Sequence, residues 1–160
     1  MSQSDQVLRN LLVSFLKDAN AHATFEQAIA DFPSDFYNAR VKSIPYTAWE
    51  LLEHIRLAQW DILDFMRNPD YVTPDWPRDY WPKPGQEADQ AAWNATIEQI
   101  RSDLQVIQEI AANPKIDLMS ELPHAKGYTY LREMLLVIDH NAYHVGQLIT
   151  LRRALGIWQG

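Results

Sequence analysis

The sequence predicts an all-α fold, a four-helix bundle with extra short helices or turns and two long connections. Three observations lead to this prediction. Apolar residues recur at helical spacing in four parts of the chain, irregular stretches with prolines separate these parts, and we find no strand signal. The 160 residues contain no internal repeat or low-complexity tract, so we expect one domain over residues 1–160.

The first helical position is predicted near the N-terminus. Residues 5–18 have a helical apolar period, and Asn20 is the expected N-cap of a second piece that runs to Phe32, where Pro33 ends it. These pieces are either one bent helix or two. His22 lies near their junction, and we interpret it as a partly exposed polar residue. The apolar residues of the first piece are Val7, Leu8, Leu11, Leu12, Phe15 and Leu16.

A second helix is predicted from Ala48 to about Met66, because Thr47 and Glu50 match a capping box. Glu50 therefore has a structural role, which we prefer to a role as a proton carrier. His54 lies in the middle of the apolar inner face, and Asp61 follows two turns later on nearly the same line. By itself, a histidine among aliphatic residues is more often a core residue than a ligand, and Asp61 is explained by solvent or a salt bridge.

The connection over residues 68–85 contains five prolines and four aromatic residues, so it is irregular without being unstructured. A connection of this length in a compact domain is usually functional or a packed cover. We expect its aromatic side chains to pack on the bundle, and a lid over a pocket is the alternative interpretation. These side chains are Tyr71, Trp76, Tyr80 and Trp81.

A third helix is predicted over residues 87–112, where apolar residues alternate steps of four and three, as in the seam of a bundle. Asn113 and Pro114 end this helix. Residues 115–128 form the second connection, which contains His124. The seam consists of Trp93, Ile97, Ile100, Leu104, Ile107 and Ala111.

The last helix is predicted from Tyr130 to Leu155, and it contains His140 and His144. Their spacing of four residues places two imidazoles on one face, one turn apart. Glu133, Val137, Gln147 and Leu151 share this mainly apolar face, which we expect to point inward. The opposite face is also apolar, so one face is expected in the core and the other against a second chain. That opposite face consists of Leu131, Ile138, Ala142, Val145 and Ile149.

Composition excludes several classes of function. The net charge of −7 argues against nucleic-acid binding, and the lack of cysteine excludes disulfides and thiolate metal sites. No apolar run approaches the roughly 20 residues of a membrane span. The first 16 residues make a poor signal peptide, since Asp5 and Arg9 interrupt them. We therefore expect a soluble cytoplasmic protein with no membrane partner, whose metal sites use nitrogen or oxygen ligands.

The pair of histidines in the last helix needs a third ligand to bind a metal, and His54 is the natural candidate. Three neutral imidazoles with an open fourth position suit Zn²⁺ or another borderline divalent ion in a catalytic site. Other metal motifs fit less well. A di-iron bundle needs Glu-x-x-His on helices, but the single match, at Glu121 and His124, contains a proline, and the zincin motif needs glutamate where Asn141 stands.

Residues 139–158, DHNAYHVGQLITLRRALGIW, resemble the C-terminal signature of the DinB/YfiT-like superfamily. Residues 49–71 and 76–82, the latter reading WPRDYWP, resemble the matching helix and loop of one DinB-like subfamily. The resemblance covers most of the chain. It implies a four-helix bundle, a homodimer, and a divalent metal, often nickel or zinc, bound by a triad that corresponds to His54, His140 and His144.

Related families include bacillithiol S-transferases and mycothiol-dependent maleylpyruvate isomerase. The resemblance therefore implies a low-molecular-weight thiol cosubstrate, activated at the metal, and a small electrophilic substrate. One stretch departs from the pattern: residues 124–129 read HAKGYT where a glycine-rich stretch is expected, and the bulky Tyr128 is expected to alter the mouth of the pocket.

Two hypotheses for the function follow. The first is a metal-dependent enzyme, such as a thiol S-transferase or a hydrolase-like enzyme, in which a thiol or water attacks an electrophile. The second is a non-catalytic, metal-stabilised dimeric bundle that acts as a sensor or scaffold. A third, simpler interpretation is that the three histidines only pair with buried carboxylates such as Asp61 and bind no metal. In the enzyme, Asp61, Tyr143 and Gln147 are candidates to orient ligands, Trp76 and Trp81 to shield the site, and Glu50 and His124 to carry protons.

Overall fold

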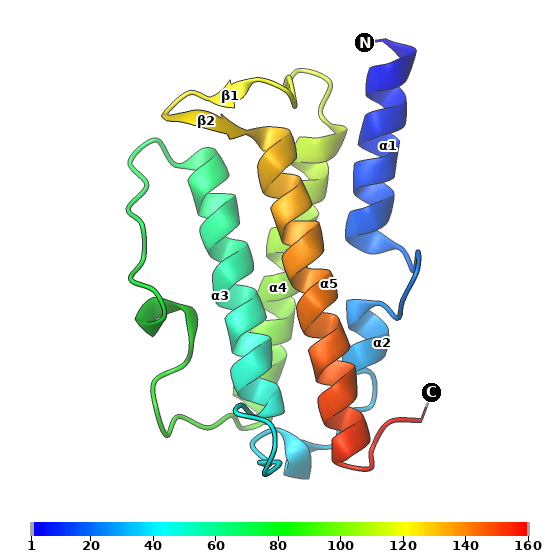
Figure 1. The fold of residues 1–160 in the computed structure, drawn as a ribbon, viewed down its shortest axis with the longest axis vertical. Coiled ribbons are helices and arrows are strands. Elements are labelled where there is room, and N and C mark those ends of the chain that lie inside the picture. Colours follow the sequence, from blue (N-terminus) through cyan, green and yellow to red (C-terminus); the bar gives the residue numbers. More distant parts are fainter. Residues whose placement is uncertain (1, 160) are drawn as a thin grey trace.

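Five α-helices form the described part of the chain, and two of them share one position of a four-helix bundle (Figure 1). The computed structural model describes residues 2–159. Helices α3, α4 and α5 run the length of the bundle, and the short α1 and α2 follow one another beside α5. The predicted all-α bundle is confirmed. Its helices are α1 (Gln3–Lys17), α2 (Phe25–Ile29), α3 (Ala48–Arg67), α4 (Gln90–Ala112) and α5 (Tyr130–Ala154).

The start and end of α2 differ from the prediction. The N-cap is Thr24, whose hydroxyl accepts from the Gln27 backbone while the Gln27 side chain accepts from the Thr24 backbone. Asn20 instead donates to the Ser14 and Asp18 carbonyls near the end of α1. Asn20 is a suitable single cap, but Thr24 and Gln27 form a capping box, which satisfies two backbone donors at once. Helix α2 also ends before Phe32, at Ile29.

The capping box at the start of α3 is confirmed. Thr47 accepts from the Glu50 backbone, and a carboxylate oxygen of Glu50 accepts from the Thr47 backbone at 2.8 Å. Arg40 donates to the other oxygen of the same carboxylate. Both carboxylate oxygens of Glu50 therefore accept hydrogen bonds at the start of α3, which agrees with its predicted structural role.

Two buried arginines hold the ends of other helices. Arg9 of α1 donates to the carbonyls of Ala111, Asn113 and Ile116, where α4 ends. Arg152 of α5 does the same for α2, donating to the carbonyls of Ala28 and Ala30. The last carbonyls of a helix lack partners within it, and each arginine donates to buried or partly buried carbonyls at and just beyond such an end. Side chains far apart in sequence therefore complete the helix ends.

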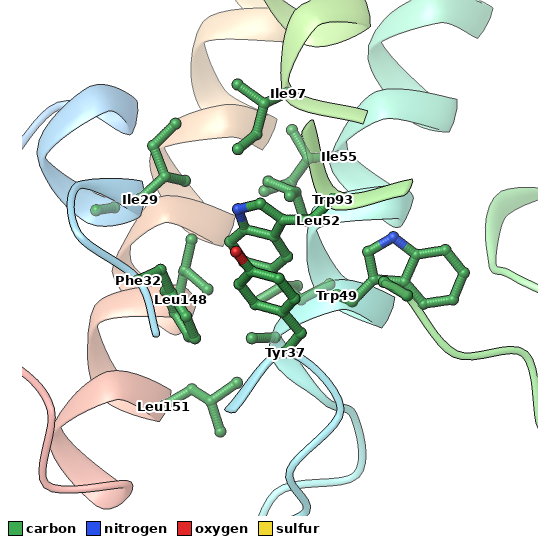
Figure 2. Close-up of a cluster of buried hydrophobic side chains, with 14 of the residues drawn as sticks. Ile29, Phe32, Tyr37, Trp49, Leu52, Ile55, Trp93, Ile97, Leu148 and Leu151 are labelled. Atoms are coloured by element: carbon green, nitrogen blue, oxygen red, sulfur yellow. The ribbon is translucent and has the colours of Figure 1, made fainter. Parts of the chain in front are cut away.

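The apolar core is divided into two clusters along the bundle. Figure 2 shows the lower one, in which the rings of Tyr37 and Trp93 stack at a centroid distance of 4.0 Å. It draws on the first half of α3 and the second half of α5, while the other cluster draws on the opposite halves. Between the clusters lies a polar group of residues from α3 and α5. These residues are His54, Gln59, His140, Asn141 and His144.

A small hairpin was missed by the sequence prediction, which found no strands. Strand β1 (Glu121–Leu122) pairs antiparallel with β2 (Ala125–Thr129) at the end of the bundle where α5 begins. Strands of two and five residues are too short for an alternating pattern to be recognised. His124 lies in the turn between them.

The second apolar face of α5 is mostly covered by the same chain, so the expectation that it faces another chain is wrong for most of its residues. Val145 is buried, Leu131 and Ile138 pack on one core cluster, and Ile149 packs on the other. Helices α1 and α2 provide this cover. The large apolar side chains of α5 that stay exposed are Leu135, Leu136 and Tyr143.

The long connection over residues 68–85 runs along the outer side of α3 and contains a short 3₁₀ helix, η2 (Arg78–Tyr80). A second 3₁₀ helix, η1 (Ser34–Phe36), lies between α2 and α3. These elements agree with the predicted extra short helices and two long connections. Among the described residues, no helix has the length and apolar character needed to cross a bilayer.

Candidate metal centre

His54 of α3 meets His140 and His144 of α5 in the polar layer between the two core clusters. The two helices are neighbours in the bundle, so their inward faces bring the three rings together. The Nε2 atom of His54 lies 3.2 Å from Nε2 of His144 and 3.3 Å from Nε2 of His140. One donor atom from each residue lies within 4.8 Å of the other two. The triad is therefore positioned to hold a metal ion.

Hydrogen bonds at the far side of two rings fix which nitrogen faces the centre. Nδ1 of His54 donates to the backbone oxygen of Tyr80 at 2.7 Å, and Nδ1 of His144 donates to Oε1 of Gln147 at 2.7 Å. In a neutral imidazole, a proton on Nδ1 leaves Nε2 with its lone pair. Both rings thus present an acceptor to the same point, as a metal requires.

Two acceptor nitrogens that face each other at 3.2 Å repel unless a cation lies between them. Nitrogens bound to Zn²⁺ at about 2.0–2.1 Å in tetrahedral geometry lie about 3.3 Å apart. The separations of Nε2 of His54 from the other two Nε2 atoms match this value. The donor set therefore fits a divalent ion of the zinc type, with three nitrogens from the protein and a fourth position for another ligand.

Burial keeps the three imidazoles neutral. It lowers the pKa of His140 to about 4, with further lowering by His144 and His54. Burial also lowers the pKa of His54 and of His144, against the opposing effects of the hydrogen bonds to Tyr80 and Gln147. A neutral imidazole is the form that binds a metal, so no proton has to be displaced at neutral pH.

His140 differs from the other two histidines in the hydrogen bonding of its Nδ1. Its Nδ1 is buried without a well-formed hydrogen bond, although the Asn141 side chain beside it raises the pKa slightly. The Asn141 amide donates to Gln59 at 2.8 Å, and Gln59 donates to the carbonyl of Ile100 at 2.8 Å. A buried polar chain thus runs from α5 through α3 to α4 next to this ligand.

Aromatic rings surround the triad. The Trp81 ring stacks on His54 at a centroid distance of 4.2 Å and an angle of 4°, and Trp76 meets the same ring edge-on at 6.3 Å. On the α5 side, Tyr143 meets His144 at 5.0 Å. Trp76 and Tyr143 are 70% and 64% exposed, so they stand at the solvent edge of the site. The predicted packing of the connection on the bundle is confirmed by the contact of Trp81 with His54 of α3, while its role as a lid stays a prediction.

Asp61 does not touch the triad directly. Its two carboxylate oxygens accept hydrogen bonds from the hydroxyls of Tyr71 and Tyr80, each at 2.7 Å. The interpretation that the histidines pair with Asp61 is wrong, because this carboxylate is engaged by tyrosines. It reaches His54 only through Tyr80, whose backbone oxygen accepts from that ring.

Three other predicted residues do not join the triad. Nε2 of His124 donates to the backbone oxygen of Phe65, near the end of α3 and three turns beyond His54. Tyr128 packs edge-on against Phe65 and under the Arg132 guanidinium, so it does not line the mouth of the site as expected. Glu50 is held in its capping box. None of these residues has the contacts that a proton carrier at the triad would need.

The comparison with protein families agrees with this arrangement. A family model described as DinB family matches residues 1–159. The chain belongs to the DinB family. The search of curated proteins and the search of solved structures each found no match.

Two parts of this DinB family site could not be recognised in the sequence. The backbone oxygen of Tyr80 accepts from His54, and a backbone atom leaves no signature in residue type. Gln59 looked like an ordinary polar residue of α3, although it is fully buried beside the site. A fully buried glutamine needs hydrogen-bond partners, but its burial becomes visible only when the helix faces are known.

Proposed function

We propose that this DinB family protein is a divalent-metal-dependent enzyme that activates a low-molecular-weight thiol, or water, for attack on a small electrophilic substrate. His54, His140 and His144 are the proposed ligands, and Zn²⁺ or Ni²⁺ is the proposed ion. The observation that carries the proposal is the convergence of three Nε2 atoms, two of them with fixed lone pairs, at distances that suit one ion.

The number of protein ligands supports an enzyme over a structural metal site. Structural zinc sites usually have four protein ligands, whereas catalytic sites keep one position open. Among residues 2–159, the triad is the one group of three or more metal-binding side chains. A bound Zn²⁺ or Ni²⁺ would supply a Lewis acid that lowers the pKa of a coordinated thiol or water towards neutrality.

The protein's own residues have distinct tasks in this proposal. Tyr80 and Gln147 hold the Nδ1 protons of His54 and His144 and so fix the ligand tautomers. Trp81 covers the face of His54 and excludes water from that side. The exposed rings of Trp76 and Tyr143 offer apolar surface to a substrate at the open edge.

Elemental analysis of untagged protein tests the metal site. We expect close to one Zn or Ni per chain in the parent, and loss of the ion in His54→Ala, His140→Ala and His144→Ala. His124→Ala is the matched control, since it removes an imidazole that lies outside the triad. A parent protein that stays metal-free after incubation with both ions would contradict the proposal.

Turnover and access to the ion separate the enzyme from a sensor or scaffold. Protein loaded with Co²⁺ should change its visible spectrum when a small thiol or an anion such as azide binds at the open position. Conjugation of thiols to electrophiles should then depend on the metal and disappear in His144→Ala. A spectrum that no exogenous ligand changes would favour the non-catalytic role.

A homodimer remains part of this proposal. Val7, Leu11 and Phe15 recur every four residues along α1, and each is more than half exposed. Together with Leu135 and Leu136 of α5, they support a dimer that covers this apolar surface. Light scattering should give twice the monomer mass, and Phe15→Glu should reduce it to the monomer mass. A monomeric parent would contradict the dimer.

A further inference from the structure

We propose that Tyr80 and Asp61 clasp the connection over residues 68–85 onto α3, and that this clasp couples loop closure to metal affinity at His54. The inference rests on the proposed metal binding by the triad. It assigns a positioning role to Tyr80 and Asp61, neither of which contacts the ion, and it makes the connection a part of the metal site.

Tyr80 forms hydrogen bonds through both its side chain and its backbone. Its hydroxyl donates to Asp61 at 2.7 Å, and its backbone oxygen accepts from Nδ1 of His54 at 2.7 Å. The next residue, Trp81, stacks on the same imidazole at 4.2 Å. Two adjacent loop residues therefore fix the orientation and the tautomer of the His54 ring. Both contacts exist only while the connection lies against α3.

Asp61 is well placed to hold the loop. It follows His54 by seven residues on α3, almost two full turns, so both side chains lie on the same face. Its carboxylate is an acceptor only, and it receives the hydroxyls of Tyr80 and Tyr71 on separate oxygens. Hydrogen bonds to an ionised acceptor are stronger than neutral ones. Burial, together with the Asp61 carboxylate, raises the pKa of Tyr71 to about 12, so its hydroxyl remains a donor.

Loss of the hydrogen bond between Tyr80 and Asp61 would weaken metal binding by changing the tautomer of His54. Without the Tyr80 carbonyl, nothing in the described structure holds the proton of His54 on Nδ1, and the other tautomer would place a proton where the ion binds. The carbonyl belongs to the main chain, so no substitution removes it directly. The Tyr80 hydroxyl is the group that can be removed while the carbonyl remains.

The coupling acts in both directions. A metal on Nε2 requires the proton on Nδ1, which strengthens the bond to the Tyr80 carbonyl and favours the closed loop. By thermodynamic linkage, a closed loop must favour the metal by the same free energy. Metal binding should therefore protect the loop amides from hydrogen exchange, and a loosened loop should weaken metal binding.

The test compares Tyr80→Phe with Tyr71→Phe. Both remove one hydroxyl from the same carboxylate, but only Tyr80 contacts His54. Zinc affinity is measured by competition with a chromophoric chelator. We expect Tyr80→Phe to weaken zinc binding about tenfold, as for loss of other groups that orient ligands, and Tyr71→Phe to weaken it much less. Asp61→Ala should resemble Tyr80→Phe, with Asp64→Ala as its control on the same helix.

Hydrogen exchange of the parent gives a second readout that needs no variant. Adding Zn²⁺ should slow exchange at residues 78–81, and this protection should be reduced in Tyr80→Phe. Equal zinc affinities of the parent and Tyr80→Phe, or unchanged exchange on zinc binding, would overturn the clasp while leaving the metal site intact. A parent that binds no zinc would overturn the proposed function and the clasp together.

Discussion

Nδ1 of His54 lies 2.7 Å from the backbone oxygen of Tyr80, a residue 26 positions later in the chain. The candidate metal centre therefore consists of three elements, α3, α5 and the connection over residues 68–85. The connection contributes no ligand, but it sets the orientation of one. Several predictions about metal binding and stability depend on such contacts around the triad.

The first prediction concerns pH. An unperturbed histidine has a pKa of about 6.5, but burial lowers the pKa of all three ligands, and that of His140 to about 4. Protons therefore compete with the metal only at lower pH than for free imidazole. We expect the zinc Kd to stay level as the pH falls past 6.5 and to rise steeply only nearer the lowered values. A Kd that rises in parallel with imidazole protonation would contradict this.

The same shifts make the stability of the metal-free protein depend on pH. Between pH 6.5 and about 4, the unfolded chain binds protons at His140 that the folded chain does not. The free energy of unfolding should therefore fall as the pH falls through this window. Urea unfolding at several pH values checks the slope, which should be smaller in His140→Ala.

Gln147 is predicted to orient His144. Replacing Gln147 with leucine removes the acceptor for Nδ1 while keeping a side chain of similar size. Zinc affinity should fall by roughly 10- to 100-fold, the usual effect of losing a partner of a ligating histidine. Gln105→Leu, on the exposed face of α4, is the control. Equal affinities of the two variants would show that Gln147 does not orient the ligand.

Removal of the metal should leave the protein folded. Two apolar clusters fill the bundle on either side of the triad, and neither includes a histidine. Circular dichroism after chelation should show almost unchanged helix content, and saturating Zn²⁺ should raise the melting temperature because it binds only the folded state. Loss of helix on chelation would contradict this.

Asp103 is predicted to destabilise the protein at neutral pH. Burial raises the pKa of this carboxyl, and one of its oxygens has no hydrogen-bond partner. The penalty grows as the pH rises from the unfolded pKa of about 3.9 through the raised pKa of the folded state. Asp103→Asn should therefore increase the free energy of unfolding at pH 7 and lose this advantage near pH 4. The exposed Asp139→Asn serves as the control.

Arg9 is predicted to stabilise the protein by its hydrogen bonds at the end of α4. Arg9→Met leaves one buried and two partly buried carbonyls without their donor, so the free energy of unfolding should fall by about 3 kcal/mol. Arg101→Met removes an exposed pair with Glu26 and Glu98 and should cost less than about 1 kcal/mol. Similar losses in urea unfolding would contradict the role of Arg9.

The long helices and the triad could be predicted because both depend on spacing that is local in the sequence. His140 and His144 share a face by helical geometry, and His54 needed only that α3 and α5 be neighbours. The hairpin at residues 121–129 was missed because its strands are too short to show a period. The contact of Tyr80 with His54 was missed because it is made by a main-chain oxygen, which any residue type has. The hydrogen bonds of Arg9 at the end of α4 were missed because the sequence alone does not distinguish a buried arginine from an exposed one.

The spacing of the ligands also determines when the site can form during synthesis. His140 and His144 follow His54 by 86 and 90 residues. A nascent chain that has been translated only as far as Leu136 holds one imidazole of the triad, whatever the metal concentration around the ribosome. Coordination of one ion by all three side chains would therefore require a chain translated past His144, and in the folded bundle an ion would reach the triad at the exposed edge formed by Trp76 and Tyr143.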